Sequence, residues 1–211
     1  NQLLNDLSNP LYNNATQVVK APGSTFKPIT AIAALEEGVG NAGEQITCTG
    51  VYEEVATPIR CSVYPGNHGS ENMVEAIQNS CNYYFNEMAH RLSMDENGNY
   101  STTRGIEKIR EYAAKFGLDS TSGVELPEVA PHISTEDPER SAMGQGTHAF
   151  SNVQLSRYVT ALANRGTVYN LSLIDRVTDS EGNLIEDYTP DVYSQVEIAD
   201  SSWDTVQAGM R

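Results

Sequence analysis

Pro28 constrains the fold more than any other residue, because it stands at the head of an apolar segment with helical spacing. The apolar side chains of segment 29–35 recur three or four residues apart, which is typical of one buried helix face. Proline lacks the backbone N–H that an interior helical residue donates, so a helix tolerates it only in the opening turn. The sequence therefore predicts a helix that begins near Ser24 and ends at the glycines that follow the segment.

The rest of the chain reads as an α+β protein that is mainly helical. Residues 41–69 have many turn residues and short β-type pieces, and residues 117–150 read as a long connection. The segment SEGN separates two strand-like stretches within residues 167–190, which predicts a late β-hairpin. Further helices are predicted at residues 70–79 with Ser70 as N-cap, after residue 82, at 103–116, at 151–166 and at 202–210.

Composition limits the classes of function that this chain can have. The 211 residues carry a formal net charge of −15, so a nucleic-acid partner is not expected, because phosphates would be repelled. The hydrophobic fraction of 39% is compatible with a packed core. The sequence contains no apolar stretch of the roughly 20 residues that would span a bilayer. The chain begins and ends abruptly, and we therefore expect a fragment whose targeting segment lies outside it.

Ser24 and Lys27 form the first candidate for chemistry, because residues three apart share one helix face. A serine hydroxyl needs a base to take its proton, and a lysine can serve if burial lowers its pKa. A helix start adds free backbone N–H groups that can bind an oxyanion. Ser-x-x-Lys is also a short pattern that chance produces, and a serine there can be an ordinary helix cap.

A longer stretch around the pair is more specific. APGSTFKPITAIAALEEG resembles the active-serine segment of penicillin-binding protein transpeptidase domains, whose motifs are Ser-x-x-Lys, Ser-x-Asn and a Lys-Thr-Gly strand. NPLYNNAT, NSCNYYFNEMA, FGLDSTSGVELPE and SAMGQGTHAFSNVQLSRYVTALANRG resemble further segments of that domain, in order. The resemblance covers nearly the whole chain and is closest to the class B, single-function transpeptidases. It implies their fold, here mainly the helical subdomain with an incomplete sheet.

The resemblance also assigns roles to four residues. It implies that Ser24 is the nucleophile and Lys27 its base. It implies that Ser80 relays a proton, and that Asn82 holds the lysine and the substrate amide. Ser-x-Asn occurs twice, at residues 70–72 and 80–82. We interpret the second copy as the motif because an apolar helix follows it, as in the family.

The third motif of the family is missing from this sequence. Neither Lys-Thr-Gly nor any Lys/Arg-Ser/Thr-Gly occurs in the 211 residues. In the family that strand follows the region where this chain stops. We therefore expect residues 1–211 to be part of a transpeptidase domain, truncated before the Lys-Thr-Gly strand, with little or no activity on their own.

Cys48, Cys61 and His68 lie in one irregular segment, and three readings of them stay open. An extracytoplasmic location favours a Cys48–Cys61 disulfide. Two thiolates and an imidazole would instead supply three of the four ligands of a structural zinc ion. The thiols can also be unlinked. Cys81, inside the second motif, is interpreted as a small packed side chain.

The resemblance implies a peptidoglycan D,D-transpeptidase that needs no cofactor. Its partners would be stem peptides ending in D-Ala–D-Ala, β-lactam antibiotics, and a membrane glycosyltransferase of the division or elongation machinery. Its place would be the outer side of the bacterial cell membrane, with the anchor outside this chain. Two alternatives remain, namely a serine β-lactamase and a non-catalytic β-lactam sensor or cell-wall scaffold.

Overall fold

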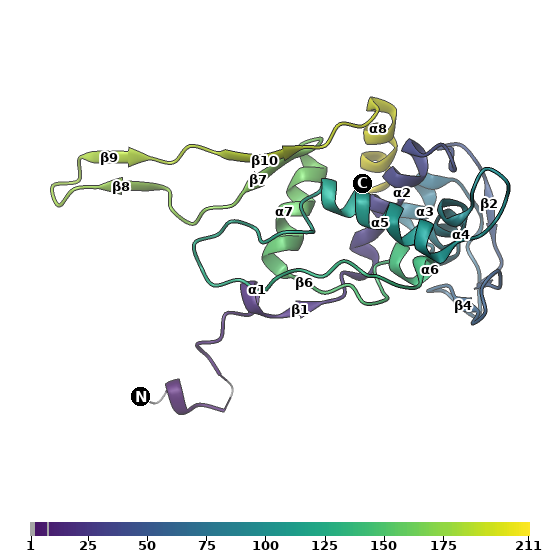
Figure 1. Cartoon of the computed structure of the whole chain (residues 1–211), viewed down its shortest axis with the longest axis horizontal. Helices are drawn as coiled ribbons and strands as arrows, with labels where there is room; N and C mark the ends of the chain where they lie inside the picture. The colour runs from purple at the N-terminus through teal and green to yellow at the C-terminus, as the bar shows by residue number, and fades with distance from the viewer. Residues whose placement is uncertain (1–2, 8) are drawn as a thin grey trace.

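The computed structural model describes residues 3–7 and 9–211, and in them helices dominate. The chain forms a helical body, and a long two-stranded arm extends from it (Figure 1). The helical elements are η1 (Leu3–Asn5), α1 (Asn14–Gln17), η2 (Gly23–Phe26), α2 (Lys27–Glu36), α3 (Met73–Gln78), α4 (Asn82–Ser93), α5 (Thr102–Lys115), α6 (Pro138–Ala142), α7 (Asn152–Ala163) and α8 (Asp200–Gly209).

The strands of the described residues pair two by two, all antiparallel, and do not join into a larger sheet. The pairs are β1–β6, β2–β5, β3–β4, β7–β10 and β8–β9. Their bounds are β1 (Val19–Lys20), β2 (Ile46–Cys48), β3 (Val51–Tyr52), β4 (Ile59–Arg60), β5 (Gly69–Glu71), β6 (Phe150–Ser151), β7 (Thr167–Asn170), β8 (Arg176–Thr178), β9 (Leu184–Asp187) and β10 (Asp191–Gln195). This arrangement confirms the expected α+β class with an incomplete sheet.

Helix α2 is the centre of the body. Its residues from Lys27 to Ala34 are all buried, and it packs against α3, α4, α5 and α8. A helix that is apolar on all sides is stable only inside such a bundle. Pro28 occupies its first turn, as the sequence predicts, and the preceding turn η2 is a 3₁₀-helix that continues into it. Ser24 thus lies one turn before a rigid, fully covered helix.

Other helix boundaries follow from their caps. Ser151 caps α7 in a capping box with Gln154, which confirms the predicted start of that helix. The predicted cap at Ser70 is wrong, because Ser70 lies in strand β5 and Asn72 caps α3 together with Glu75. Ser and Asn are about equally good caps, so capping preference does not distinguish Ser70 from Asn72.

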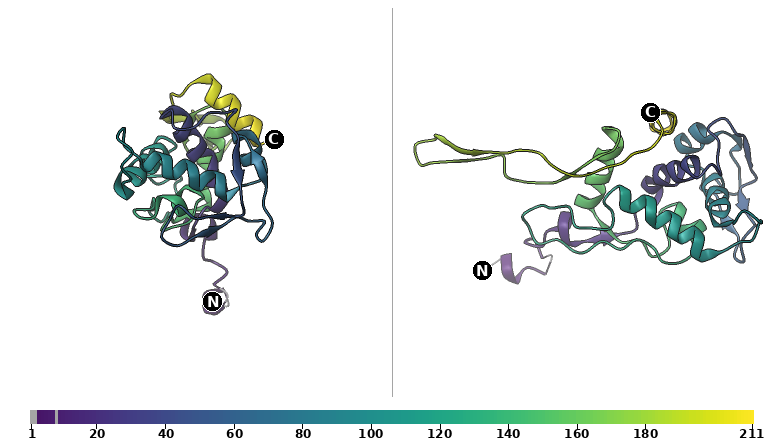
Figure 2. Two further views of the ribbon diagram at one scale, coloured as in Figure 1. Left: turned by 90° about the vertical axis from the view of Figure 1, so that its right-hand side faces the viewer. Right: turned by 45° about the horizontal axis from the view of Figure 1, so that its top comes forward.

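The predicted late hairpin is present and is longer than one strand pair. β7 pairs with β10 next to the body, and β8 pairs with β9 farther out, so the arm projects well beyond the helices (Figure 2).

The long connection at residues 117–150 contains the short helix α6, which packs against α4 and α5 and which the sequence did not predict. Among the described residues, no helix combines the length and the apolar character that crossing a bilayer requires.

Candidate active site

Ser24 lies in the 3₁₀ turn η2, and its side chain is exposed. Two contacts from distant parts of the chain hold this turn. The backbone N–H of Gly23 donates to the carbonyl oxygen of Gly144 at 2.9 Å, and the Tyr158 hydroxyl donates to the carbonyl oxygen of Thr25 at 2.8 Å. These two hydrogen bonds hold the residues on either side of Ser24, and the Ser24 side chain itself faces solvent.

Lys27 begins α2 and is 1% exposed, which is rare for a lysine. Its Nζ atom donates to the carbonyl oxygen of Ser80 at 2.7 Å, to the Ser80 Oγ at 2.9 Å and to the Asn82 Oδ1 at 2.7 Å. Burial lowers the pKa of Lys27 from its ordinary value of 10.5 to about 8. A lysine in this position is neutral in a useful fraction of molecules near neutral pH, as a proton acceptor must be.

Ser80 and Asn82 flank the start of helix α4. Ser80 has a φ of 54°, a left-handed conformation that is uncommon for residues other than glycine. Cys81 is the N-cap of α4, and Asn82 is the first helical residue. The structure thus brings Lys27 together with Ser80 and Asn82, which are more than 50 residues away in the sequence. The other Ser-x-Asn copy, at residues 70–72, makes none of these contacts, since Ser70 donates to Gln45.

An open cleft of about 540 Å³ runs along this site. Ser24 and Lys27 line it on one side, and helices α7 and α8 contribute to the other walls. Val159 of α7 has the helical spacing of a core residue relative to Leu155 and Leu162, but it lines the cleft and is 41% exposed. The full lining consists of Ser24, Thr25, Lys27, Pro28, Ile77, Gln78, Val159, Leu162, Gly209, Met210 and Arg211.

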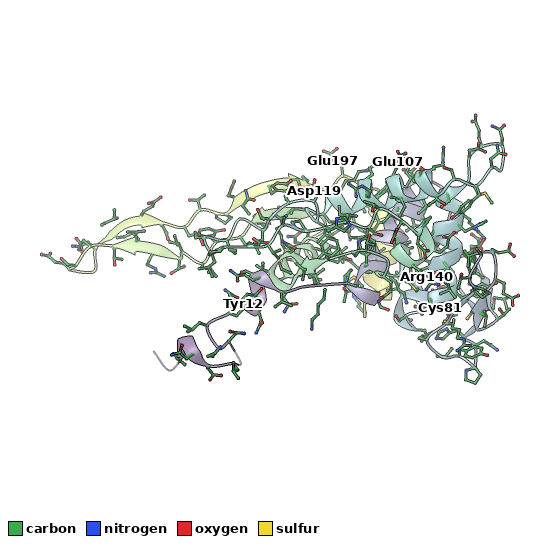
Figure 3. All side chains as sticks on the ribbon, turned by 60° about the horizontal axis from the view of Figure 1, so that its bottom comes forward. Tyr12, Cys81, Glu107, Asp119, Arg140 and Glu197 are labelled. Carbon is green, nitrogen blue, oxygen red and sulfur yellow. The ribbon has the colours of Figure 1, made fainter. Side chains whose placement is uncertain are left out.

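A second cluster lies directly behind the Ser80–Asn82 motif. The ligand atoms of Cys48, Cys61, His68 and Cys81 all lie within 4.8 Å of one another. The three cysteines are buried free thiols. Cys81 stands in the helical body at the end of the molecule opposite the arm (Figure 3). Cys48, Cys61 and His68 lie in one segment of the sequence, whereas Cys81 lies inside the second motif, where the sequence predicts only a small packed side chain.

The remaining histidines lie outside this cluster. His148 is buried between Phe26 and Phe150, and its Nδ1 accepts a hydrogen bond from the backbone N–H of Ser134. Burial lowers the pKa of His148 to about 4, so its ring is neutral at physiological pH. We assign His148 a structural role beneath the 3₁₀ turn.

The chain resembles known proteins over its whole length. The family model described as "Penicillin binding protein transpeptidase domain" matches residues 1–211. The peptidoglycan D,D-transpeptidase MrdA of Haemophilus influenzae is 27% identical over 227 residues, which cover 99% of this chain and 33% of that protein. The stage V sporulation protein D of Bacillus subtilis is 33% identical over 156 residues, which cover 70% of this chain and 22% of that protein.

Solved structures show the same fold. A peptidoglycan synthase complex contains a chain that matches with a TM-score of 0.81 and 24% identity, over 99% of this chain and 34% of that chain. Penicillin-binding protein A from Mycobacterium tuberculosis, solved as an imipenem acyl-enzyme complex, matches with a TM-score of 0.81 and 21% identity, over 99% of this chain and 47% of that chain.

The chain spans about a third of the length of the MrdA proteins that it matches. Within that span the family model covers every residue from 1 to 211. The patterns Ser-x-x-Lys and Ser-x-Asn occur at the sites described above, at residues 24–27 and 80–82. The chain belongs to the penicillin-binding protein transpeptidase domain family.

Proposed function

We propose that the protein containing this chain is a peptidoglycan D,D-transpeptidase that acts through an acyl-enzyme on Ser24. The single observation that carries the proposal is the buried Lys27, which is hydrogen-bonded to Ser80 and Asn82 and lies one helical turn after an exposed serine. The relatives support the same substrate class, since MrdA of Haemophilus influenzae is a peptidoglycan D,D-transpeptidase.

In the first half-reaction Lys27 acts as the general base. Its neutral Nζ takes the proton of the Ser24 hydroxyl while the Ser24 Oγ attacks the carbonyl carbon between the two D-alanines. Backbone N–H groups at the start of a helix stabilise the oxyanion that forms. The C–N bond then breaks, and D-alanine leaves with a proton that passes from Lys27 through Ser80. The hydroxyl of Ser80 suits this relay, because it can both donate and accept.

In the second half-reaction an amine of another stem peptide attacks the acyl carbon. A new amide bond forms, the bond to the Ser24 Oγ breaks, and the proton of the amine returns to Ser24 through the same groups. Asn82 accepts from the Lys27 Nζ at 2.7 Å through its Oδ1, and one N–H of its amide donates to the carbonyl oxygen of Arg60 at 3.4 Å, which leaves the second N–H for the substrate. Each step uses only side chains and backbone groups of the protein.

The other expectations belong to the same proposal. β-Lactams mimic the D-Ala–D-Ala end and would trap Ser24 as a stable ester. Penicillin-binding protein A from M. tuberculosis was solved as such an acyl-enzyme.

A peptidoglycan synthase complex contains a chain of this fold, which supports a membrane glycosyltransferase as the partner. We place the site on the outer side of the bacterial cell membrane, where its substrate is. We further infer that residues 1–211, which hold two of three family motifs, acylate poorly when isolated.

The test is penicillin labelling of the full-length protein. We expect a fluorescent penicillin to modify the peptide that contains Ser24, as located by mass spectrometry. Ser24→Ala should abolish the label, and Ser80→Ala should slow it by about 10²-fold, the size of a proton-transfer contribution. Ser70→Ala is the matched control from the other Ser-x-Asn copy, and its labelling should equal that of the wild type.

Two further measurements separate the alternatives. Rapid turnover of penicillin without stable label would identify a β-lactamase. Stable label with no cross-linking of stem peptides would identify a sensor or scaffold. Absence of label from the complete wild-type protein would refute the nucleophile itself.

A further inference from the structure

His148 is a buried titratable side chain that the proposed mechanism does not use. It is 4% exposed, and both nitrogens of its ring have a backbone partner. The Nδ1 accepts from the backbone N–H of Ser134 at 3.0 Å, and the Nε2 lies 3.1 Å from the carbonyl oxygen of Ser141. A carbonyl oxygen can only accept, so the Nε2 carries the proton of the neutral ring and donates it to Ser141. The two contacts therefore fix one tautomer and one orientation of the imidazole.

The hydrogen bond to Ser141 begins a short path that ends at the nucleophile. The carbonyl oxygen of Ser141 also accepts from the backbone N–H of Gly144 at 2.9 Å. The carbonyl oxygen of Gly144 in turn accepts from the backbone N–H of Gly23 at 2.9 Å. Gly23 directly precedes Ser24 in the turn η2. Successive hydrogen bonds thus join the imidazole to the turn that carries Ser24.

The face of the same ring contacts the turn after Ser24. The ring centroids of His148 and Phe26 are 4.4 Å apart, and Phe26 lies between Ser24 and Lys27 in the sequence. Phe26 is fully buried and is the residue that precedes helix α2. Phe150 packs near the imidazole as well, with 5.5 Å between the ring centroids. One side chain therefore reaches the turn both through Gly23 and through Phe26.

The loop that carries His148 is itself held in place. The backbones of His132 and Ala149 exchange two hydrogen bonds, of 2.8 and 2.9 Å, which close the loop of residues 133–148. Within the loop, the Ser141 Oγ donates to the Ser134 Oγ at 2.7 Å, so the two backbone partners of the imidazole are also tied to each other. Both serines are fully buried. The imidazole thus connects a closed, buried loop to the turn of the nucleophile.

We propose that His148 is a positioning residue for the acylation of Ser24 and that it acts mainly through its hydrogen bond to Ser141. The inference rests on the proposed function, because it concerns the same nucleophile. An apolar ring of similar size would fill the space, but it would leave the buried N–H of Ser134 without its acceptor and would release the Ser141 carbonyl from the ring. A displacement of about 1 Å, caused by a change remote from the chemistry, can slow a reaction by about 100-fold.

The test separates the two hydrogen bonds from the packing of the ring. His148→Phe keeps a ring against Phe26 and loses both hydrogen bonds, so the acylation rate constant of the full-length protein with a fluorescent penicillin should fall by about 10-fold or more. His148→Gln keeps an amide N–H that can donate to the Ser141 carbonyl, and it should acylate at least about threefold faster than His148→Phe. The dissociation constant of penicillin before acylation should be the same in all of these proteins, because His148 does not line the cleft.

His132→Phe is the matched control. His132 is exposed and is joined to the same loop through its backbone, so this variant should acylate at the wild-type rate. The final stoichiometry of the label gives the folded fraction of each variant. A slow rate at full stoichiometry therefore separates a displaced turn from an unfolded domain.

A second measurement uses the wild type and does not depend on the folding of a variant. In full-length protein labelled with ¹⁵N at histidine, the Nε2–H resonance of His148 should shift when penicillin acylates Ser24. The ring signals of His132 should stay in place. Because the path from the imidazole to Ser24 consists of direct contacts, a change at the nucleophile should be felt at the ring.

The outcomes distinguish this inference from the proposed function. The role of His148 is refuted if His148→Phe acylates as fast as the wild type, if His148→Gln is no faster than His148→Phe, or if the His148 resonance does not move on acylation. In each of these cases the wild type is still labelled at Ser24, so the proposed function stands. Absence of label in the wild type would instead refute the proposed function, and the positioning role with it.

Discussion

Gly144 is the position where a single added carbon should displace η2, the turn that carries Ser24. Its φ is +77°, and a Cβ built there would lie 1.9 Å from the carbonyl oxygen of Gly23 and 2.8 Å from its nitrogen. Those atoms are backbone, so they cannot move aside without shifting the turn that carries Ser24. Gly144→Ala therefore combines two penalties, an unfavourable left-handed φ and a clash with Gly23.

Gly38 offers a matched control that carries only the first penalty. Its φ is +68°, and nothing lies within 4 Å of a Cβ built there. The left-handed conformation costs an L-residue about 1–2 kcal/mol. Overpacking against fixed atoms costs about 1–3 kcal/mol more. We therefore expect Gly38→Ala to destabilise the domain by about 1–2 kcal/mol and Gly144→Ala by about 2–5 kcal/mol.

The assay is native-state hydrogen exchange of the full-length protein, read on peptides from helix α2, because the free energy of local opening can then be assigned to this domain. Penicillin labelling of Ser24 gives a second readout. It should slow in Gly144→Ala and stay unchanged in Gly38→Ala, which lies at the far end of α2. If the two variants lose equal stability and label equally fast, the contact between Gly23 and Gly144 does not position the turn.

Two further outcomes follow from buried cations. The acylation rate of Ser24 in the full-length protein should rise about tenfold per pH unit below pH 8 and level off above it. The reason is that only neutral Lys27 can accept the proton, and its pKa is lowered to about 8. A stopped-flow pH profile that still rises through pH 10 would contradict this. Arg157 is 1% exposed and donates to the carbonyl oxygens of Gly117, Ser120 and Thr121. Arg157→Met should destabilise the domain by at least about 3 kcal/mol, since it leaves several buried acceptors unpaired. If denaturation experiments show that the free energy of unfolding falls by less than about 1 kcal/mol, water replaces the guanidinium.

The features that local sequence determines were predicted well. Pro28 and the apolar spacing behind it located α2, because both act within one or two turns of helix. Ser151 located α7 in the same way, through its capping box. The pairing of Ser24 with Lys27 is also local. Its chemical meaning came from the resemblance, since a serine and a lysine at this spacing are common in helices.

Features that depend on distant contacts were predicted less well. Helix α6 has only five residues, and Asp137 caps it in a left-handed conformation, so periodicity gave no signal. Val159 has the spacing of a core residue but is exposed, because its side of α7 borders the cleft and no element covers it there. Cys81 was not grouped with Cys48, Cys61 and His68 because it joins them only through the packing of helix α4 against β2, β3 and β4.

The complete burial of α2 also bears on how this protein can vary. Residues from Lys27 to Ala34 have no exposed face, so almost any change in them disturbs packing against four helices. Heritable changes that alter reactivity toward β-lactams are therefore expected on the exposed walls of the cleft, at positions such as Val159 and Met210. The helix that carries Lys27 is the part of the site with the least freedom to evolve.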